Sequence, residues 1–239
     1  NPEIIWACQC AKGYQEHKWQ PHVLPNDYNF TPYLDKMTKW NGYKISWSFM
    51  HTFDPEDKRL LTIASEYTSK DGVVHNEKND SQDPSAQLYL GAVPLKYEFD
   101  PDCTGEDSQI DWIIYRYADV LTLTAEAIVR NKNAVTKEAV DLLNEVRTRS
   151  LPGKGYSLQD LNSVDKFLKA VLDERGWELY FEGNRRQDLI RYGIFVETIK
   201  KKAQSMGKQT LVDENRHRFP IPQSIIDEGK GVIEQNPGY

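Results

Sequence analysis

The chain has 239 residues and carries 30 Lys and Arg against 36 Asp and Glu, which gives a formal net charge of −6 at pH 7. Nucleic acid is excluded as an expected partner, because the neutralisation of phosphates requires a basic excess that is absent here. A transmembrane segment is not expected either, because no apolar run approaches the ~18–20 residues that cross a bilayer.

The amino-terminal part of the chain, residues 1–110, is predicted to consist of short strands joined by long polar loops. Turn residues interrupt it repeatedly, and its apolar runs are brief. Buried strands are expected at 4–8, at 60–64 and within 88–99, where Pro94 would interrupt the pairing. The very polar stretch 69–85 is predicted to be a mobile surface loop.

Helical periodicity begins near residue 110. Asp111 is the predicted N-cap of a helix whose inward face carries apolar residues at steps of four and three. These residues are Ile114, Ala118, Leu121, Ala125 and Ile128. A turn at 131–133 leads to Thr136, the predicted N-cap of a second helix, so the two helices should form an antiparallel hairpin.

Three further helical elements are predicted, at about 165–181, at 184–202 and at 223–227. Gly183 ends the first of them, and Pro220 and Pro222 enforce an extended turn before the last. The expected fold class is α+β, mainly α with long loops and a few short strands. Residues 111–239 form the helical region, and we expect it to make one structural unit with 1–110.

One motif in the helical region carries a family resemblance. The segment ERGWELYFEGNRRQDLIRYG at 174–193 resembles the helix-turn-helix signature of the SusD/RagB family of nutrient-binding lipoproteins. Other matching stretches follow in the family's order, and they are FDPEDKRL at 53–60, LKY at 95–97, RYADVL at 116–121, LNEVRTR at 143–149, FPIP at 219–222 and NPGY at 236–239.

The resemblance implies a function and a location. Members of this family are outer-membrane lipoproteins at the bacterial surface, about twice this length, with a helical half built from tetratricopeptide-like units. They lie over a SusC-like TonB-dependent transporter and hold a nutrient, usually an oligosaccharide or polysaccharide and in some branches a peptide, without catalysis or a cofactor. This chain would then be the carboxy-terminal portion, lipid-anchored through an amino-terminal segment that it does not contain.

An acidic row in the signature segment admits two interpretations. Glu174, Glu178 and Glu182 fall at four-residue steps on one helix face, where paired carboxylates could hydrolyse a glycosidic bond. We favour a structural ion network, because arginines close in sequence can neutralise the row. The predicted partners are Arg175, Arg185, Arg186 and Arg191.

Metal sites have little support in the sequence. Oxygen-bearing side chains stand at calcium-loop spacing at Asp100, Asp102, Thr104 and Asp111, but an Asp in place of the usual final Glu favours a plain acidic loop. The five histidines form no i, i+4 pair, and three cysteines are too few for a disulfide framework or a four-ligand zinc site. We therefore expect no metal and no cofactor.

Aromatic residues within 13–47 are the best indication of a binding surface. Tryptophan and tyrosine rings can stack on the apolar faces of sugars, while amides pair with hydroxyl groups. Six rings lie close in sequence, at Trp19, Tyr28, Tyr33, Trp40, Tyr43 and Trp47. The predicted ligand-binding residues are Trp19, Trp40, Asn41, Tyr43 and Trp47.

The resemblance therefore implies non-catalytic capture of a nutrient for delivery to a transporter, and the aromatic loops favour a glycan as that nutrient. Two alternatives stay open. The helical hairpin resembles one tetratricopeptide unit, which would suit a protein or peptide interaction module. The acidic row would suit a glycoside hydrolase.

Overall fold

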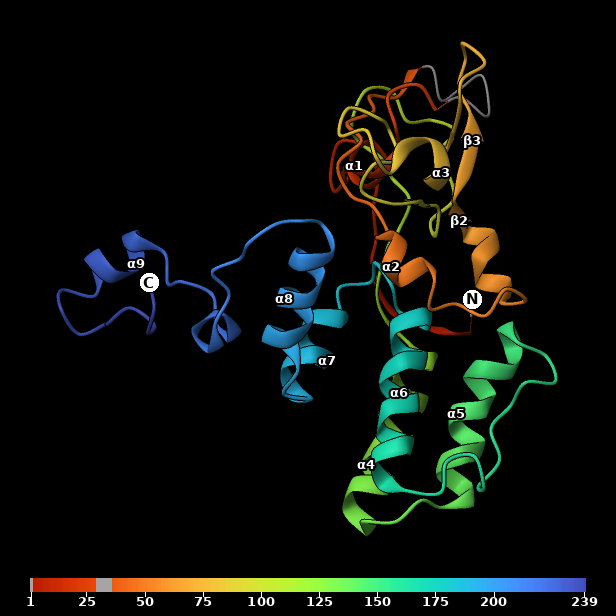
Figure 1. Cartoon of the computed structure of the whole chain (residues 1–239). Coiled ribbons are helices and arrows are strands. Elements are labelled where there is room, and N and C mark those ends of the chain that lie inside the picture. Colours follow the sequence, from red (N-terminus) through yellow and green to blue (C-terminus); the bar gives the residue numbers. More distant parts are fainter. Residues whose placement is uncertain (1, 29–35) are drawn as a thin grey trace. The chain divides into compact units, whose positions relative to one another are not determined.

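The computed structural model of the chain describes residues 2–28 and 36–239. It divides into two compact units, Asn1–Glu182 and Gly183–Tyr239 (Figure 1). Within the first unit, a strand pairing joins residues 4–8 to residues 112–116. The amino-terminal loops and the helical hairpin therefore belong to one unit.

Within the described residues, the strands form three two-stranded antiparallel sheets. Strand β1 (Ile4–Cys8) pairs with β6 (Trp112–Arg116), β2 (Ile63–Ala64) with β5 (Val93–Pro94), and β3 (Glu66–Thr68) with β4 (Val74–Asn76). The strand predicted at 4–8 is confirmed, but the prediction that it is buried was wrong. Its centre faces solvent, with Ile5 56% and Trp6 60% exposed.

The other two strand predictions were correct only in part. Residues 58–62 form the 3₁₀ helix η2 (Lys58–Thr62), because Asp57 caps it by accepting a hydrogen bond from the backbone of Arg59. The strand that follows has only two residues. The strand within 88–99 is the two-residue β5, which ends at Pro94, where the sequence predicts an interruption.

The polar stretch predicted as a mobile loop has regular structure. It contains β4 and the short helix α3 (Glu77–Asp80), which is capped by the side chain of Asn76. His75 is buried there, with Nδ1 2.8 Å from Asp80 and Nε2 3.0 Å from Asp27. These partners allow a polar segment to fold against the core.

The loop region contains two more short helices, α1 (Trp19–Val23) and α2 (Trp47–Met50). Its core is a buried apolar cluster that includes Val23, Leu24, Leu88 and Val93. Residues from distant parts of the loops therefore share one core, which fixes the loops without long secondary structure.

Three long helices make the rest of the first unit: α4 (Tyr117–Lys132), α5 (Lys137–Ser150) and α6 (Val164–Glu178), which pack side by side (Figure 1). Buried residues such as Val129, Leu143 and Phe167 form their core. Thr136 caps α5 as predicted, by accepting a hydrogen bond from the amide of Ala139. The predicted cap at Asp111 was wrong, because residues 112–116 pair with β1 and α4 begins only at Tyr117.

The second unit contains α7 (Arg185–Arg191), α8 (Phe195–Ser205), the 3₁₀ helix η3 (Glu214–His217) and α9 (Gln223–Glu228). The single helix predicted at 184–202 is two helices. Gly193 lies between them with φ +70°, a left-handed conformation that ends a helix. The short helix predicted near the end is confirmed as α9. No helix in the described part of the chain is both long and apolar enough to span a bilayer.

Candidate functional site

The carboxylate of Glu174 lies in a buried ion cluster. This residue faces inward from α6 and is fully buried. Its Oε1 accepts a hydrogen bond from Nη1 of Arg59 at 2.6 Å, and its Oε2 accepts one from Nη1 of Arg147 at 3.1 Å. Arg59 is held in turn by Asp57, whose Oδ2 lies 2.6 Å from Nη2. Each oxygen of the buried charge therefore has a cationic partner.

The other two carboxylates of the row share Arg116. This guanidinium group donates from Nη1 to Glu178 at 2.5 Å, and from Nε and Nη2 to Glu182 at 2.7 and 2.9 Å. Arg149 also pairs with Glu178, and Lys96 pairs with Glu182. The row is thus neutralised, as the ion-network interpretation expects.

The arginines that the structure places on the row were not among those predicted. Arg175 follows Glu174 directly, about 100° further around α6, and it pairs with Asp119 at 2.6 Å. Arg191 pairs with Asp188 at 2.9 Å, and Arg185 begins α7 in the second unit. The guanidinium groups that contact the row come from distant segments and are Arg59, Arg116, Arg147 and Arg149.

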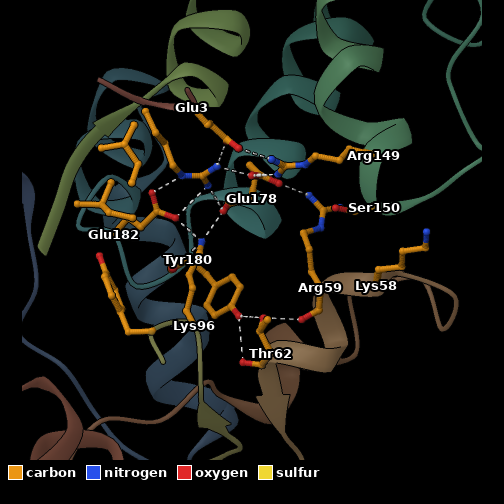
Figure 2. Close-up of a pocket in the computed structure, with 14 residues that line it drawn as sticks. Glu3, Lys58, Arg59, Thr62, Lys96, Arg149, Ser150, Glu178, Tyr180 and Glu182 are labelled. Carbon is orange, nitrogen blue, oxygen red and sulfur yellow. Dashed lines mark hydrogen bonds and ion pairs between the residues drawn. The ribbon is translucent and has the colours of Figure 1, made fainter. Parts of the chain in front are cut away.

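A cavity of about 350 Å³ opens beside this cluster (Figure 2). Among its lining residues, Lys96 donates to the carbonyl of Glu178 at 2.6 Å and lies 4.4 Å from the centre of the Tyr180 ring. Burial lowers the pKa of Lys96 to about 8, although Glu182 acts in the opposite direction. The phenol of Tyr180 is fixed by Thr62, to whose carbonyl it donates at 3.2 Å.

The surroundings of Glu178 in this cavity differ from those of a general acid in glycoside hydrolysis. A general acid requires a raised pKa and access to the substrate. Burial acts to raise the pKa of Glu178, but Arg116 and Arg149 prevail and lower it. Glu178 therefore stays ionised among three guanidinium groups, those of Arg59, Arg116 and Arg149, which suits a structural role.

Three of the aromatic residues singled out in the loops are packed into the fold. Tyr28 is buried in the core. Trp19 is partly buried and meets Tyr97 edge-on, and Trp47 donates its indole N–H to the carbonyl of Leu88 at 3.1 Å. These contacts favour a packing role for Trp19 and Trp47. Tyr33 lies outside the described residues.

The rings of Trp40 and Tyr43 are exposed, and both contact the ring of His22. We call these three rings the ring platform. Trp40 is 38% and Tyr43 53% exposed. The ring centre of His22 lies 4.6 Å from Trp40 and 5.1 Å from Tyr43. Asn41 stands between the two aromatics with φ +54° and donates its side-chain amide to the carbonyl of Gln87 at 3.1 Å, so this amide is used within the fold.

The calcium candidate is not assembled. Both carboxylate oxygens of Asp100 accept backbone hydrogen bonds, from Asp102 at 3.0 Å and Gln109 at 2.8 Å. Asp111 accepts from the amide of Cys10 at 2.9 Å, and Thr104 lines a small cavity beside Asp100 and Asp102. Across residues 2–28 and 36–239, no group of three or more His, Cys, Asp or Glu is placed to hold a metal ion.

Sequence reasoning missed the roles of several residues. His22 has no motif, and only the fold brings it to Trp40 and Tyr43. Arg59, Arg116, Arg147 and Arg149 do lie in the stretches that carried the family resemblance. Those stretches come together at the ion cluster, so the resemblance itself was the signal that could have identified them.

The fold resembles known structures of SusD-type proteins. A SusD homologue from Bacteroides thetaiotaomicron aligns with a TM-score of 0.64 and 27% identity, over 85% of this chain and 46% of that one. Surface glycan-binding protein A of the same organism, in complex with laminarihexaose, aligns with a TM-score of 0.69 and 18% identity, over 98% and 52%. The predicted α+β class, mainly α with few short strands, is confirmed.

Comparison with known sequences shows the family to which the chain belongs. SusD-like protein P2 of Formosa agariphila is 27% identical over 209 residues, which cover 84% of this chain and 41% of the relative. The starch-binding protein SusD of Bacteroides thetaiotaomicron is 31% identical over 131 residues, 53% of this chain and 21% of that protein. The model of the SusD family matches residues 62–239, and the chain belongs to this family. It spans less than half the length of these two relatives.

Proposed function

We propose that this protein binds a glycan on the ring platform and does not turn it over. The observation that carries the proposal is the exposure of Trp40 and Tyr43, whose rings both contact the ring of His22. Large aromatic rings are normally buried, so two exposed rings in contact with a third indicate a surface for stacking. The starch-binding relative and the laminarihexaose complex of a protein with this fold support a sugar as the ligand.

The chemistry around the platform suits a hydroxylated ligand. Lys18 lies 5.8 Å from the centre of the Trp40 ring and forms an ion pair with Glu106 at 2.7 Å. The ion pair therefore places a hydrogen-bond donor and acceptors beside the apolar face of the Trp40 ring. A pyranose ring has a matching combination of hydroxyl groups and an apolar C–H face. An open surface of this kind gives modest affinity, which suits capture followed by release.

The test is binding of a polysaccharide panel to the wild-type protein and to Trp40→Ala. We expect at least one glycan to bind, and a loss of about tenfold in affinity for Trp40→Ala, equivalent to about 1.4 kcal/mol. Tyr14→Ala is the control, because the Tyr14 ring is more exposed than either ring of the platform but is not part of it. Equal affinity of wild type and Trp40→Ala would exclude the platform, and failure of every glycan would exclude sugar capture.

Absence of turnover needs its own assay. The bound glycan should release no reducing ends during prolonged incubation. Product release that is lost in Glu178→Gln would instead establish hydrolysis at the acidic row.

We also propose, on family membership, that the protein acts at the bacterial surface. It would be lipid-anchored in the outer membrane and would deliver its ligand to a SusC-like TonB-dependent transporter. Co-purification of the transporter with the tagged protein from outer membranes, without any cross-linker, is the expected result. Recovery of the tagged protein only from the cytoplasm would refute this location.

One observation favours a second candidate function, a protein interaction module. Helix α4 is apolar on two faces, and Tyr117, Val120 and Leu123 on its outer face are exposed. Failure of all glycans, together with a peptide whose binding is lost in Val120→Asp, would support this candidate instead.

A further inference from the structure

The carboxyl end of α1 is capped by the segment that carries the ring platform. A helix leaves its last four carbonyl groups without partners in the helix, and in α1 these belong to residues 21–24. Trp40 donates its amide to the carbonyl of Pro21 at 2.7 Å, and Asn41 donates to Leu24 at 2.9 Å. The backbone amides of Gly42 and Tyr43 each donate to the carbonyl of His22 at 2.8 Å.

This arrangement leaves the carbonyl of Val23 for a side chain. The ammonium group of Lys44 donates to it at 3.0 Å. With that bond, all four terminal carbonyls of α1 have partners, and all the donors come from residues 40–44. A cation at a helix carboxyl end is also favoured by the helix dipole.

Lys44 stands where the chain passes from solvent to core. The preceding ring of Tyr43 is exposed, whereas Ile45, the following residue, is buried and forms a bridge with Ala92. The Lys44 side chain is partly buried, and in the described part of the chain no carboxylate forms an ion pair with it. Burial lowers the pKa of Lys44 to about 7. A lysine placed this way costs stability relative to an apolar side chain of similar length, so packing alone does not account for it.

We propose that Lys44 is a positioning residue for ligand capture, and that its bond to the Val23 carbonyl holds the turn of residues 40–43 with both rings facing solvent. This inference rests on the proposed function of the platform. It assigns the side chain no direct contact with the ligand. Removing the bond should leave the fold intact. The turn should then sample conformations in which the rings of Trp40 and Tyr43 no longer contact the ring of His22.

The test compares Lys44→Met, which keeps the length of the side chain and removes the donor, with the wild-type protein. The matched control is Lys36→Met, because Lys36 is an exposed lysine eight residues earlier. We expect an unchanged or higher melting temperature at pH 7 and an affinity for the glycan about fivefold lower. Hydrogen exchange at the amides of Gly42 and Tyr43 should be about tenfold faster, while exchange at Leu143 in α5 is unchanged.

The results distinguish failure of glycan binding on the ring platform from failure of the positioning role of Lys44. If the wild-type protein binds no glycan, sugar capture fails, and exchange at Gly42 and Tyr43 still decides whether Lys44 orders the turn. If Trp40→Ala loses binding but Lys44→Met keeps both affinity and slow exchange, the positioning role is refuted. Faster exchange at Leu143 as well would show a general structural role and would also refute it. Lys44→Gln, with a shorter donor, serves if Lys44→Met does not fold, and Lys44→Arg should restore slow exchange.

Discussion

Replacement of Arg116 by Met should strongly destabilise the first unit. All five N–H donors of Arg116 are used: Nε and Nη2 contact Glu182, Nη1 contacts Glu3 and Glu178, and Nη2 also donates to the carbonyl of Glu178. Loss of one partner from a buried ion pair costs about 3–5 kcal/mol, because the remaining charge stays buried without its counter-ion. Lys96 and Arg149 retain part of the pairing, so we expect about 3 kcal/mol.

The destabilisation should depend on pH. The pKa of Glu178 is lowered in the folded state, so its ion pairs contribute stability above its unfolded pKa of about 4.3. That contribution is lost as the pH falls through the lowered folded value. Arg116→Met forfeits part of it, so the difference in unfolding free energy from the wild type should be largest at neutral pH and smaller near pH 3.

Urea unfolding followed by tryptophan fluorescence measures this effect, because all six tryptophans lie between residues 6 and 177 and report on the first unit alone. Lys137→Met is the control, because its pair with Asp141 at 2.6 Å is exposed and should contribute no more than about 0.5 kcal/mol. A loss below about 1 kcal/mol for Arg116→Met, or a loss that does not change with pH, would refute the argument that the cluster is a buried structural network.

Three other changes test separate features. Gly91→Ala should lower the free energy of unfolding in urea by more than about 2 kcal/mol, because Gly91 has φ +144° and an added Cβ would lie 1.8 Å from the carbonyl oxygen of Ile45. Near-normal stability of this variant would contradict the geometry. Thr136→Ala should cost about 1 kcal/mol through loss of the cap on the Ala139 amide, measured the same way, and Thr136→Ser should retain most of the stability. Because the folded pKa of Lys44 is about 7 and the unfolded value about 10.4, the unfolded state binds more protons between these values. The stability of the wild type relative to Lys44→Met should therefore rise from pH 7 to 10, and a flat difference would contradict the burial of this amine.

Local signals in the sequence predicted much of the helical part of the fold. The cap at Thr136 and the apolar face of α5 depend only on neighbouring residues, and both are present. The strand β6 was missed because its residues also fit a helical pattern. These residues form a strand because they pair with residues more than a hundred positions away, as Trp112 does with Cys8.

The candidate site was predictable only in outline. An acidic row favours arginine partners, but sequence proximity suggested Arg175, which pairs with Asp119. The true partner Arg59 lies 115 residues before Glu174. For the aromatic loops, composition cannot separate the exposed Trp40 from the packed Trp47, because tryptophan serves both purposes.

The ion cluster has a consequence for synthesis of the protein. Arg59 and Arg116 leave the ribosome well before Glu178, which lies 119 and 62 residues further along the chain. Until that helix has been made, Asp57 and Glu3 neutralise these cations only in part, so burying them would be unfavourable and the nascent loops should stay hydrated and open. The centre of the first unit should therefore close late, once Glu174, Glu178 and Glu182 supply the remaining counter-charges.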